Sequence, residues 1–225
     1  MSNSMKTVVF IISLIAYFIY LSISSAFINI TEATGSIAYV TLAIFISSAV
    51  GILVMLYAQA SVKYWYSSRQ LKNSTVHVKL PIGKFRLTDR LLVYFIPALA
   101  IIIPVAQTRS FSAITWPLVL FLALIIIIVE VLFYVNSKTM MAYITNKGII
   151  IRGIDLRLEI PIPSNYHNPS GYFPFNRIIT FLDLNDKLLV EHSHDLGSII
   201  LKSDSDTLKQ IKAVLIANGI KQKKF

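Results

Sequence analysis

The chain has 225 residues, of which 55% are hydrophobic and only 14% are charged, and its mean hydropathy is +0.67. Soluble domains average about 45–50% apolar and about 25% charged residues, so this composition is typical of a membrane protein. The absence of cysteine excludes disulfides, thiolate metal sites and cysteine nucleophiles. The net charge of +10 suits either nucleic acid or anionic lipid as a partner, and the distribution of charge along the chain decides between them.

Four segments are apolar enough to cross a bilayer, whose hydrocarbon core of about 30 Å requires roughly 20 residues of helix. The third segment is shorter and carries Pro97 and Pro104. The first also resembles a secretory signal peptide, and cleavage would remove residues 1–26 and leave three spans in the same orientation. The predicted spans of this α-helical membrane domain (residues 1–135) are Thr7–Ile30, Ser36–Ala60, Leu91–Gln107 and Trp116–Val135.

The connections between these spans differ sharply in charge. The short connections Thr31–Gly35 and Thr108–Thr115 hold only Glu32 and Arg109, whereas all other Lys and Arg residues lie at the N-terminus, in the loop 61–90 or after residue 135. The positive-inside rule therefore predicts a multi-pass protein of the bacterial inner membrane with both termini in the cytoplasm. Because the basic residues flank the spans, anionic headgroups account for them and we expect no nucleic-acid partner.

Polar groups within the spans decide between a transport path and an anchor. Glu130 lies near the cytoplasmic end of the fourth span, where it is either an ionisable transport site or an acid that reaches the interface or a loop cation. The two prolines indicate kinks, and no internal repeat accompanies them. Ser47 and Gly51 form a small-residue pair that favours close helix packing. An anchor bundle is the favoured interpretation.

The basic loop 61–90 contains two different patterns. Lys63, Trp65 and Arg69 interleave cations with aromatic rings, which is typical of a segment lying along lipid headgroups. Further on, Val76, Val78 and Leu80 alternate with polar residues, which predicts a strand. This strand either pairs with an edge of the C-terminal domain or belongs to a loop that skims the membrane.

After residue 135 the composition changes to short β-like runs, which predicts a small β-barrel or sandwich over residues 136–225. A glycine turn at Asn146–Gly148 joins the first two runs, and residues 161–174 read as a loop. A helix with N-terminal acids after Ser203 closes the domain, and Asn218-Gly219 ends it, with Ile220 packing back on Leu215. The expected strands are Lys138–Thr145, Ile149–Gly153, Leu156–Ile160, Asn176–Asp183, Lys187–Ser193 and Ser198–Ser203.

The order of these runs resembles the bacterial pleckstrin-homology-like (PH-like) domains that lie next to membrane spans. "YITNKGIIIRG" (Tyr143–Gly153) is similar to the opening hairpin of that family, and "FPFNRIITFLDLNDKLLV" (Phe173–Val190) looks like a later strand pair. The likeness covers residues 138–220. It implies a seven-stranded barrel plugged by a helix and a role in protein or membrane-surface interaction, and some multi-span relatives are associated with resistance to bacteriocins. Phosphoinositide binding is not implied, because Lys147 and Arg152 make no basic cluster.

No pattern in the chain predicts catalysis. His192 and His194 would share one face of a strand and are weak metal candidates, but Ser, Asp and Gly around them also suit a polar turn. We expect no cofactor, no catalytic residue and no enzymatic activity.

These features predict a membrane protein that presents a cytoplasmic PH-like interaction domain and acts as a non-catalytic scaffold, regulator or immunity-type factor. Its expected partners are a bilayer with anionic headgroups and either an unknown protein or a second copy. Candidate surface contacts are Lys63, Trp65, Arg69, Lys147 and Arg152. The alternative is a small transporter or channel component with Glu130 as its ionisable site and the C-terminal domain as its regulator.

Overall fold

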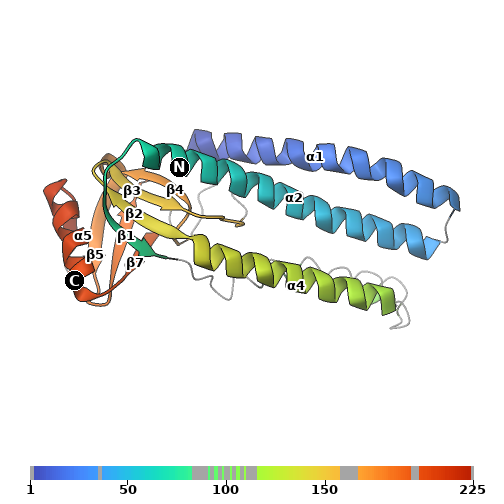
Figure 1. The fold of residues 1–225 in the computed structure, drawn as a ribbon. Helices are drawn as coiled ribbons and strands as arrows, with labels where there is room; N and C mark the ends of the chain where they lie inside the picture. The colour runs from blue at the N-terminus through green and yellow to red at the C-terminus, as the bar shows by residue number, and fades with distance from the viewer. Residues whose placement is uncertain are drawn as a thin grey trace. The chain divides into compact units, whose positions relative to one another are not determined.

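The computed structural model describes residues 3–34, 37–82, 116–157, 167–193 and 198–223, with isolated positions between 91 and 109. Three helices in these ranges are long and apolar enough to cross a membrane: α1 (Asn3–Thr34), α2 (Ile37–Lys72) and α4 (Trp116–Thr139) (Figure 1). The predicted span Leu91–Gln107 lies largely outside the described residues.

The contacts divide the chain into two compact units. The first unit contains Met1–Ile11, Gln59–Lys84 and Val135–Phe225, and the second contains Ile12–Ala58 and Phe85–Tyr134. The first unit therefore includes the expected C-terminal domain together with the N-terminus and the segment that carries β1.

Four antiparallel strands form the first sheet, in the order β1-β2-β3-β4 (Figure 1). Leu80 of β1 pairs with Ala142 of β2, so the alternating segment of the loop 61–90 pairs with the C-terminal domain. The hairpin expected at Asn146 joins β2 to β3. The strands are β1 (Val76–Pro81), β2 (Met141–Thr145), β3 (Gly148–Arg152) and β4 (Gly171–Pro174).

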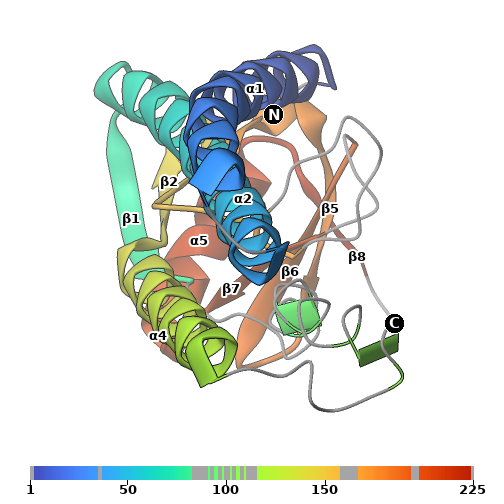
Figure 2. The ribbon, with the colours of Figure 1, turned by 90° about the vertical axis from the view of Figure 1, so that its right-hand side faces the viewer.

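The second sheet has the order β7-β6-β5-β8. Its first three strands are antiparallel, whereas β8 runs parallel to β5, with Lys221 beside Thr180 (Figure 2). The 3-10 turn Phe175–Arg177 leads from β4 into this sheet. Its strands are β5 (Ile178–Asp183), β6 (Lys187–His192), β7 (Ser198–Lys202) and β8 (Lys221–Lys223).

Helix α5 (Ser205–Ala217) covers one side of the two sheets (Figure 1). The Asp204 carboxylate caps it by accepting the Thr207 backbone N–H at 2.9 Å, and this bond, with those from the Thr207 and Ser203 hydroxyls, lowers the pKa of Asp204 to about 2. The Ile220 and Gly219 N–H groups donate to the carbonyls of Leu215 and Ile216 at 3.0 and 2.9 Å. With Gly219 at φ +78°, this is the predicted Schellman ending.

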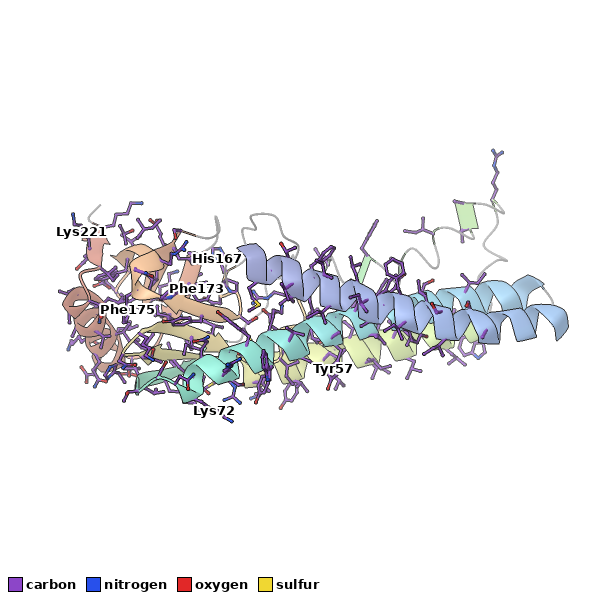
Figure 3. All side chains as sticks on the ribbon, turned by 90° about the horizontal axis from the view of Figure 1, so that it is seen from above. Tyr57, Lys72, His167, Phe173, Phe175 and Lys221 are labelled. Carbon is purple, nitrogen blue, oxygen red and sulfur yellow. The ribbon has the colours of Figure 1, made fainter. Side chains whose placement is uncertain are left out.

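One apolar core lies between the sheets and the helix. Phe173 and Phe175 point into it from β4 and the 3-10 turn (Figure 3). Val78 and Leu80 of β1 belong to the same core, so a segment of the loop 61–90 completes it. The apolar face of α5 contributes Leu208, Ile211 and Leu215.

Several element boundaries differ from the predictions. Helix α2 continues past Ala60 to Lys72, because its buried residues Lys63 and Ser67 recur at helical spacing and pack into the first unit. Strands β4 and β8 were not expected, since their short sequences lack alternation and their pairing with β3 and β5 defines them. Helix α4 continues to Thr139, where a strand was predicted. In the predicted strand Leu156–Ile160, Leu156 and Arg157 are not extended ladder residues, and the rest lies outside the described residues.

In the second unit, α1 and α2 approach closely at small residues. The Ser47 hydroxyl donates to the Ser24 hydroxyl at 2.6 Å. A Cβ atom added at Gly51 would lie 2.9 Å from the Tyr17 ring and 3.2 Å from the Tyr20 ring. The close packing predicted at Ser47 and Gly51 is confirmed.

Candidate functional site

The most heavily charged interior site of the first unit is an ion cluster around Asp155. Arg157 holds this carboxylate with two parallel bonds, from Nε to Oδ1 at 2.8 Å and from a terminal nitrogen to Oδ2 at 3.0 Å. Lys63 of α2 places its Nζ 3.5 Å from Oδ2. The side chains of Lys63, Asp155 and Arg157 are 0%, 1% and 13% exposed. We call these three residues the Asp155 cluster.

Backbone groups complete the bonding of the Asp155 cluster. Arg157 donates to the carbonyl oxygens of His167 and Asn168 at 2.6 and 2.7 Å. Lys63 Nζ donates to the Arg157 carbonyl at 3.0 Å, and the Ser170 N–H donates to the Asp155 carboxylate at 3.3 Å. The charges are thus bonded to one another and to the chain.

The electrostatics keep Asp155 ionised in spite of its burial. Desolvation alone would raise the pKa of Asp155, but the positive charges of Arg157 and Lys63 and the hydrogen bonds from Arg157 outweigh it and lower that pKa far below its usual range. A carboxylate with so low a pKa is a poor general base. The arrangement therefore suits a structural connection better than proton transfer.

The same segment is also held by the end of α4. The Ile154 N–H donates to the Thr139 hydroxyl at 3.2 Å, and the side-chain amide of the buried Asn136 donates to the Ile154 carbonyl. Residues 153–157 are therefore bonded to the C-terminal turns of two helices, α2 and α4.

On its other side the cluster connects to β7, at the edge of the second sheet. Asn168, at φ +52°, accepts the Ile200 N–H through its side-chain oxygen at 2.6 Å and donates its own N–H to the Ser198 carbonyl at 3.0 Å. The His167 ring nitrogen Nδ1 lies 2.8 Å from the Ser198 hydroxyl. A bonded path therefore runs from the end of α2 through the Asp155 cluster to β7.

Glu130, the acid of the candidate span Leu122–Thr139 that was singled out in the sequence, has a partner within the second unit. The Tyr94 hydroxyl donates to its carboxylate. The Tyr94 ring also lies edge-on to Phe133, with ring centres 6.4 Å apart. Tyr94 thus bonds to Glu130 and packs against the small apolar cluster of Ile125, Val129 and Phe133 on α4.

The two candidate metal ligands have different outcomes. His192 is buried in β6, and its ring centre lies 4.8 Å from that of Phe173 in the core. His194 lies outside the described residues. Within the described part of the chain, no three His, Asp or Glu side chains are grouped as a metal site.

The candidate surface contacts do not form one cluster. Lys63 is buried in the Asp155 cluster instead of lying along headgroups, because the face of α2 that carries it packs into the first unit. Trp65 is 60% exposed, with the Arg69 guanidinium 5.8 Å from its ring. Arg152 stacks over Tyr64 at 4.5 Å, and Lys147 donates to the Asn73 carbonyl at 2.7 Å.

Asp155 and Arg157 were not singled out from the sequence. The signal available was their opposite charge at a two-residue spacing, directly after an apolar strand. Lys63 gave a second signal, since it shares a helix face with the small residues Ala60 and Ser67. Only the fold brings these signals together.

The chain matches no known protein family, no characterised protein and no solved structure.

Proposed function

We propose that the protein is a non-catalytic scaffold, regulator or immunity-type factor of the bacterial inner membrane, which presents its β-rich domain to a protein partner in the cytoplasm. Three helices long and apolar enough to cross a membrane, α1, α2 and α4, support the membrane location. The clustering of basic residues beside the spans supports a cytoplasmic domain and two cytoplasmic termini.

The pairing of β1 with β2 supports a four-span topology. Pro81 of β1 pairs with Met141 of β2, so both strands lie on one side of the membrane. Helix α4 lies between them in the chain. If α4 crosses the membrane, the chain must cross once more between the two strands, and the predicted span Leu91–Gln107 is the segment apolar enough to do so.

Strand order supports the assignment of a PH-like domain. The first sheet is a four-stranded meander, β5 to β7 form a three-stranded meander, and α5 follows them. These seven strands and the helix equal the number that the resemblance implies, provided that β1 supplies the first strand. Strand β8 is an addition to that pattern.

The observation that carries the functional proposal is the Asp155 cluster. It bonds the β-rich domain to the end of α2, while Asn136 and Thr139 bond it to the end of α4. Within the first unit, these bonds attach the β-rich domain firmly to the ends of two helices, as a scaffold requires. The buried charges of the Asp155 cluster bond to one another and to the chain. The surface of the domain is therefore left to bind the protein partner.

The candidate contacts for the partner are exposed apolar residues of β5 and α5. Lys212 is ion-paired with Asp183 at the end of β5, and the chain beyond α5 returns beside Thr180. Helix α5 therefore runs antiparallel to β5. Ile179 and Ile216, on these two elements, are large apolar residues left exposed. Exposed apolar side chains rimmed by charges are typical of protein-binding surfaces.

Photo-crosslinking in native membranes tests the proposal. A photoreactive residue placed at position 179 or 216 of the full chain should capture a defined protein or a second copy. Ile179→Asp and Ile216→Asp should each reduce binding of that species, whereas Asn185→Asp, an equal charge change at an exposed turn of the same sheet, should not. Capture of nothing, or a species unaffected by either isoleucine change, contradicts the proposal.

The second candidate function is a small transporter or channel component with Glu130 as its ionisable site. The hydrogen bond from Tyr94 favours it, because a hydroxyl beside an intramembrane carboxylate can pass or position a proton. Ion or proton flux in proteoliposomes should then fall with Glu130→Gln. A flux indifferent to that change removes this candidate.

A further inference from the structure

The C-terminal turns of α2 have one exposed face. The exposed residues there are Ser61, Tyr64, Trp65, Arg69 and Lys72. Ser61, Trp65, Arg69 and Lys72 recur at helical spacing, and we call them the α2 stripe. The opposite face, with Gln59, Lys63 and Ser67, is buried in the first unit. The α2 stripe therefore points away from the β-rich domain.

The chemistry of the α2 stripe is cationic and aromatic. The Arg69 guanidinium lies over Trp65, and beside it Arg152 of β3 stacks on Tyr64 and donates to its hydroxyl. The sequences of α2, β1, β2 and β3 contain no Asp or Glu. By contrast, several lysines of the second sheet and α5 are ion-paired with acids, as in Lys202–Asp186 and Lys209–Asp206.

The α2 stripe is continuous with a candidate membrane span. The span Ile46–Lys72 has 27 residues, which at 1.5 Å per residue is about 40 Å, or about 10 Å more than the hydrocarbon core. Tyr57 and Trp65 are both strongly exposed, and aromatic rings of this kind favour the membrane interface.

Distances along the helix agree with the thickness of a headgroup layer. Arg69 lies four residues beyond Trp65, or about 6 Å along the axis, and Lys72 lies about 10 Å beyond it. Each headgroup layer is roughly 5–7 Å thick. With Trp65 at its inner boundary, Arg69 and the snorkelling Lys72 reach the phosphates.

We propose that the α2 stripe is a binding surface for anionic phospholipid headgroups, with Trp65 in the interface and Arg69 and Lys72 on the lipid phosphates. The cation–aromatic pairs hold the guanidinium groups away from acids and leave their outer edges for phosphate oxygens. The inference depends on α2 crossing the membrane and not on binding of a protein partner.

Tryptophan fluorescence gives a direct test, because the chain has only two tryptophans, Trp65 and Trp116. Full-length Trp116→Phe protein is placed in nanodiscs of phosphatidylcholine and phosphatidylglycerol, with bromine on the acyl chains of one lipid at a time. Brominated phosphatidylglycerol should quench Trp65 more strongly than brominated phosphatidylcholine does, and added salt should reduce the difference. Arg69→Gln and Lys72→Gln should each lower this preference on the order of fivefold, because one basic residue at an anionic surface contributes about 1 kcal/mol.

Matched controls separate this inference from other causes. Lys202→Gln with Lys209→Gln removes two exposed cations elsewhere and should leave the preference unchanged. The Trp65→Phe protein, with Trp116 as reporter, checks insertion of the spans. Equal quenching by both lipids, equal loss in the control pair, or an unquenched Trp65 beside a quenched Trp116 overturns the proposal, while crosslinking at positions 179 and 216 tests partner binding separately.

Discussion

At the scale of single residues, the Asp155 cluster places three ionic side chains where water is excluded. Burying a charge costs several kcal/mol, and only close pairing with hydrogen bonds offsets that cost. Lys63, Asp155 and Arg157 meet this condition through their mutual bonds and three backbone carbonyls. The cluster therefore specifies one arrangement of α2 and the β-rich domain more than it adds stability.

Replacement of Asp155 by Asn should destabilise the protein strongly, because it leaves Lys63 and Arg157 buried without their counter-ion. We expect a loss of about 3–5 kcal/mol in the free energy of unfolding. Asp206→Asn, which removes an exposed acid of α5, should change it by less than about 0.5 kcal/mol. Chemical unfolding in detergent, followed by circular dichroism, measures both. Similar losses of unfolding free energy in the two variants would show that the Asp155 cluster does not hold the β-rich domain to the end of α2.

Acid should reduce the difference in unfolding free energy between the wild-type protein and Asp155→Asn. Since folding lowers the pKa of Asp155, its ionic stabilisation is complete above the unfolded-state pKa of about 3.9 and is lost as the pH falls below it. Each pH unit below about 4 should reduce the difference in unfolding free energy by up to about 1.4 kcal/mol. Unfolding curves of both proteins between pH 6 and pH 3 test this direction. A difference in unfolding free energy that increases as the pH falls contradicts the prediction.

The contacts of individual side chains were the least completely predicted from the sequence. Trp65 and Arg69 have the exposure expected of headgroup contacts, but Lys63 is buried. A lysine two residues from an exposed tryptophan occupies a different helix face, and only the position of the β-rich domain decides which face is covered. Arg157 was assigned to the predicted strand Leu156–Ile160 and Asp155 was assigned to no element, because the contact of Asp155 with Lys63 joins distant segments of the chain.

At the scale of elements, the features that depend only on neighbouring residues could be predicted from the sequence. The β2–β3 hairpin, the cap of α5 and its Schellman ending depend on neighbouring residues and were predicted. Strand β4 contains a glycine and a proline, and β8 is Lys-Gln-Lys, so neither shows a strand pattern. Pairing with β3 and β5 makes them strands, and the sequence does not encode such pairing locally.

Strand β1 is an essential part of the domain core. Leu80 is 1% exposed and belongs to the core shared by both sheets. Leu80→Ala should therefore lower the unfolding free energy of the β-rich domain by about 2–5 kcal/mol, as for other large-to-small core changes. Val76→Ala, at an exposed position of the same strand, is the matched control. Equal effects of the two variants would mean that β1 does not complete the core.

The contact of α1 with α2 can be tested by disulfide formation, since the chain has no cysteine of its own. Ser24 and Ser47 touch through their hydroxyls, so Ser24→Cys with Ser47→Cys should crosslink rapidly on mild oxidation. Ser22→Cys with Ser47→Cys should not, because Ser22 lies on another face of α1. Gly51→Leu should slow the first reaction, since its side chain would collide with Tyr17. Gel mobility before and after reduction reports each result.

At the scale of the whole molecule, the four-span topology makes a labelling prediction. Cysteine at Thr75 or Asn185, both exposed in the first unit, should react with an impermeant maleimide only from the cytoplasmic side. Cysteine at Arg109 should react only from the opposite side. Labelling of spheroplasts and inverted vesicles distinguishes the two. If position 109 shares the side of position 75, the crossing proposed between β1 and α4 does not occur.

The position of strand β1 in the chain has a consequence for folding during synthesis. The ribosome completes β1 before it synthesises α4, yet the strand's partner β2 follows α4. If the segment between β1 and β2 crosses the membrane twice, as the proposed topology requires, Val78 and Leu80 keep an unpaired strand edge exposed until that segment has been inserted. Under that topology, completion of the first sheet shows that the insertion has succeeded. A chain that inserts wrongly keeps β1 and β2 on opposite sides of the bilayer, and the exposed edge then marks it for aggregation or degradation.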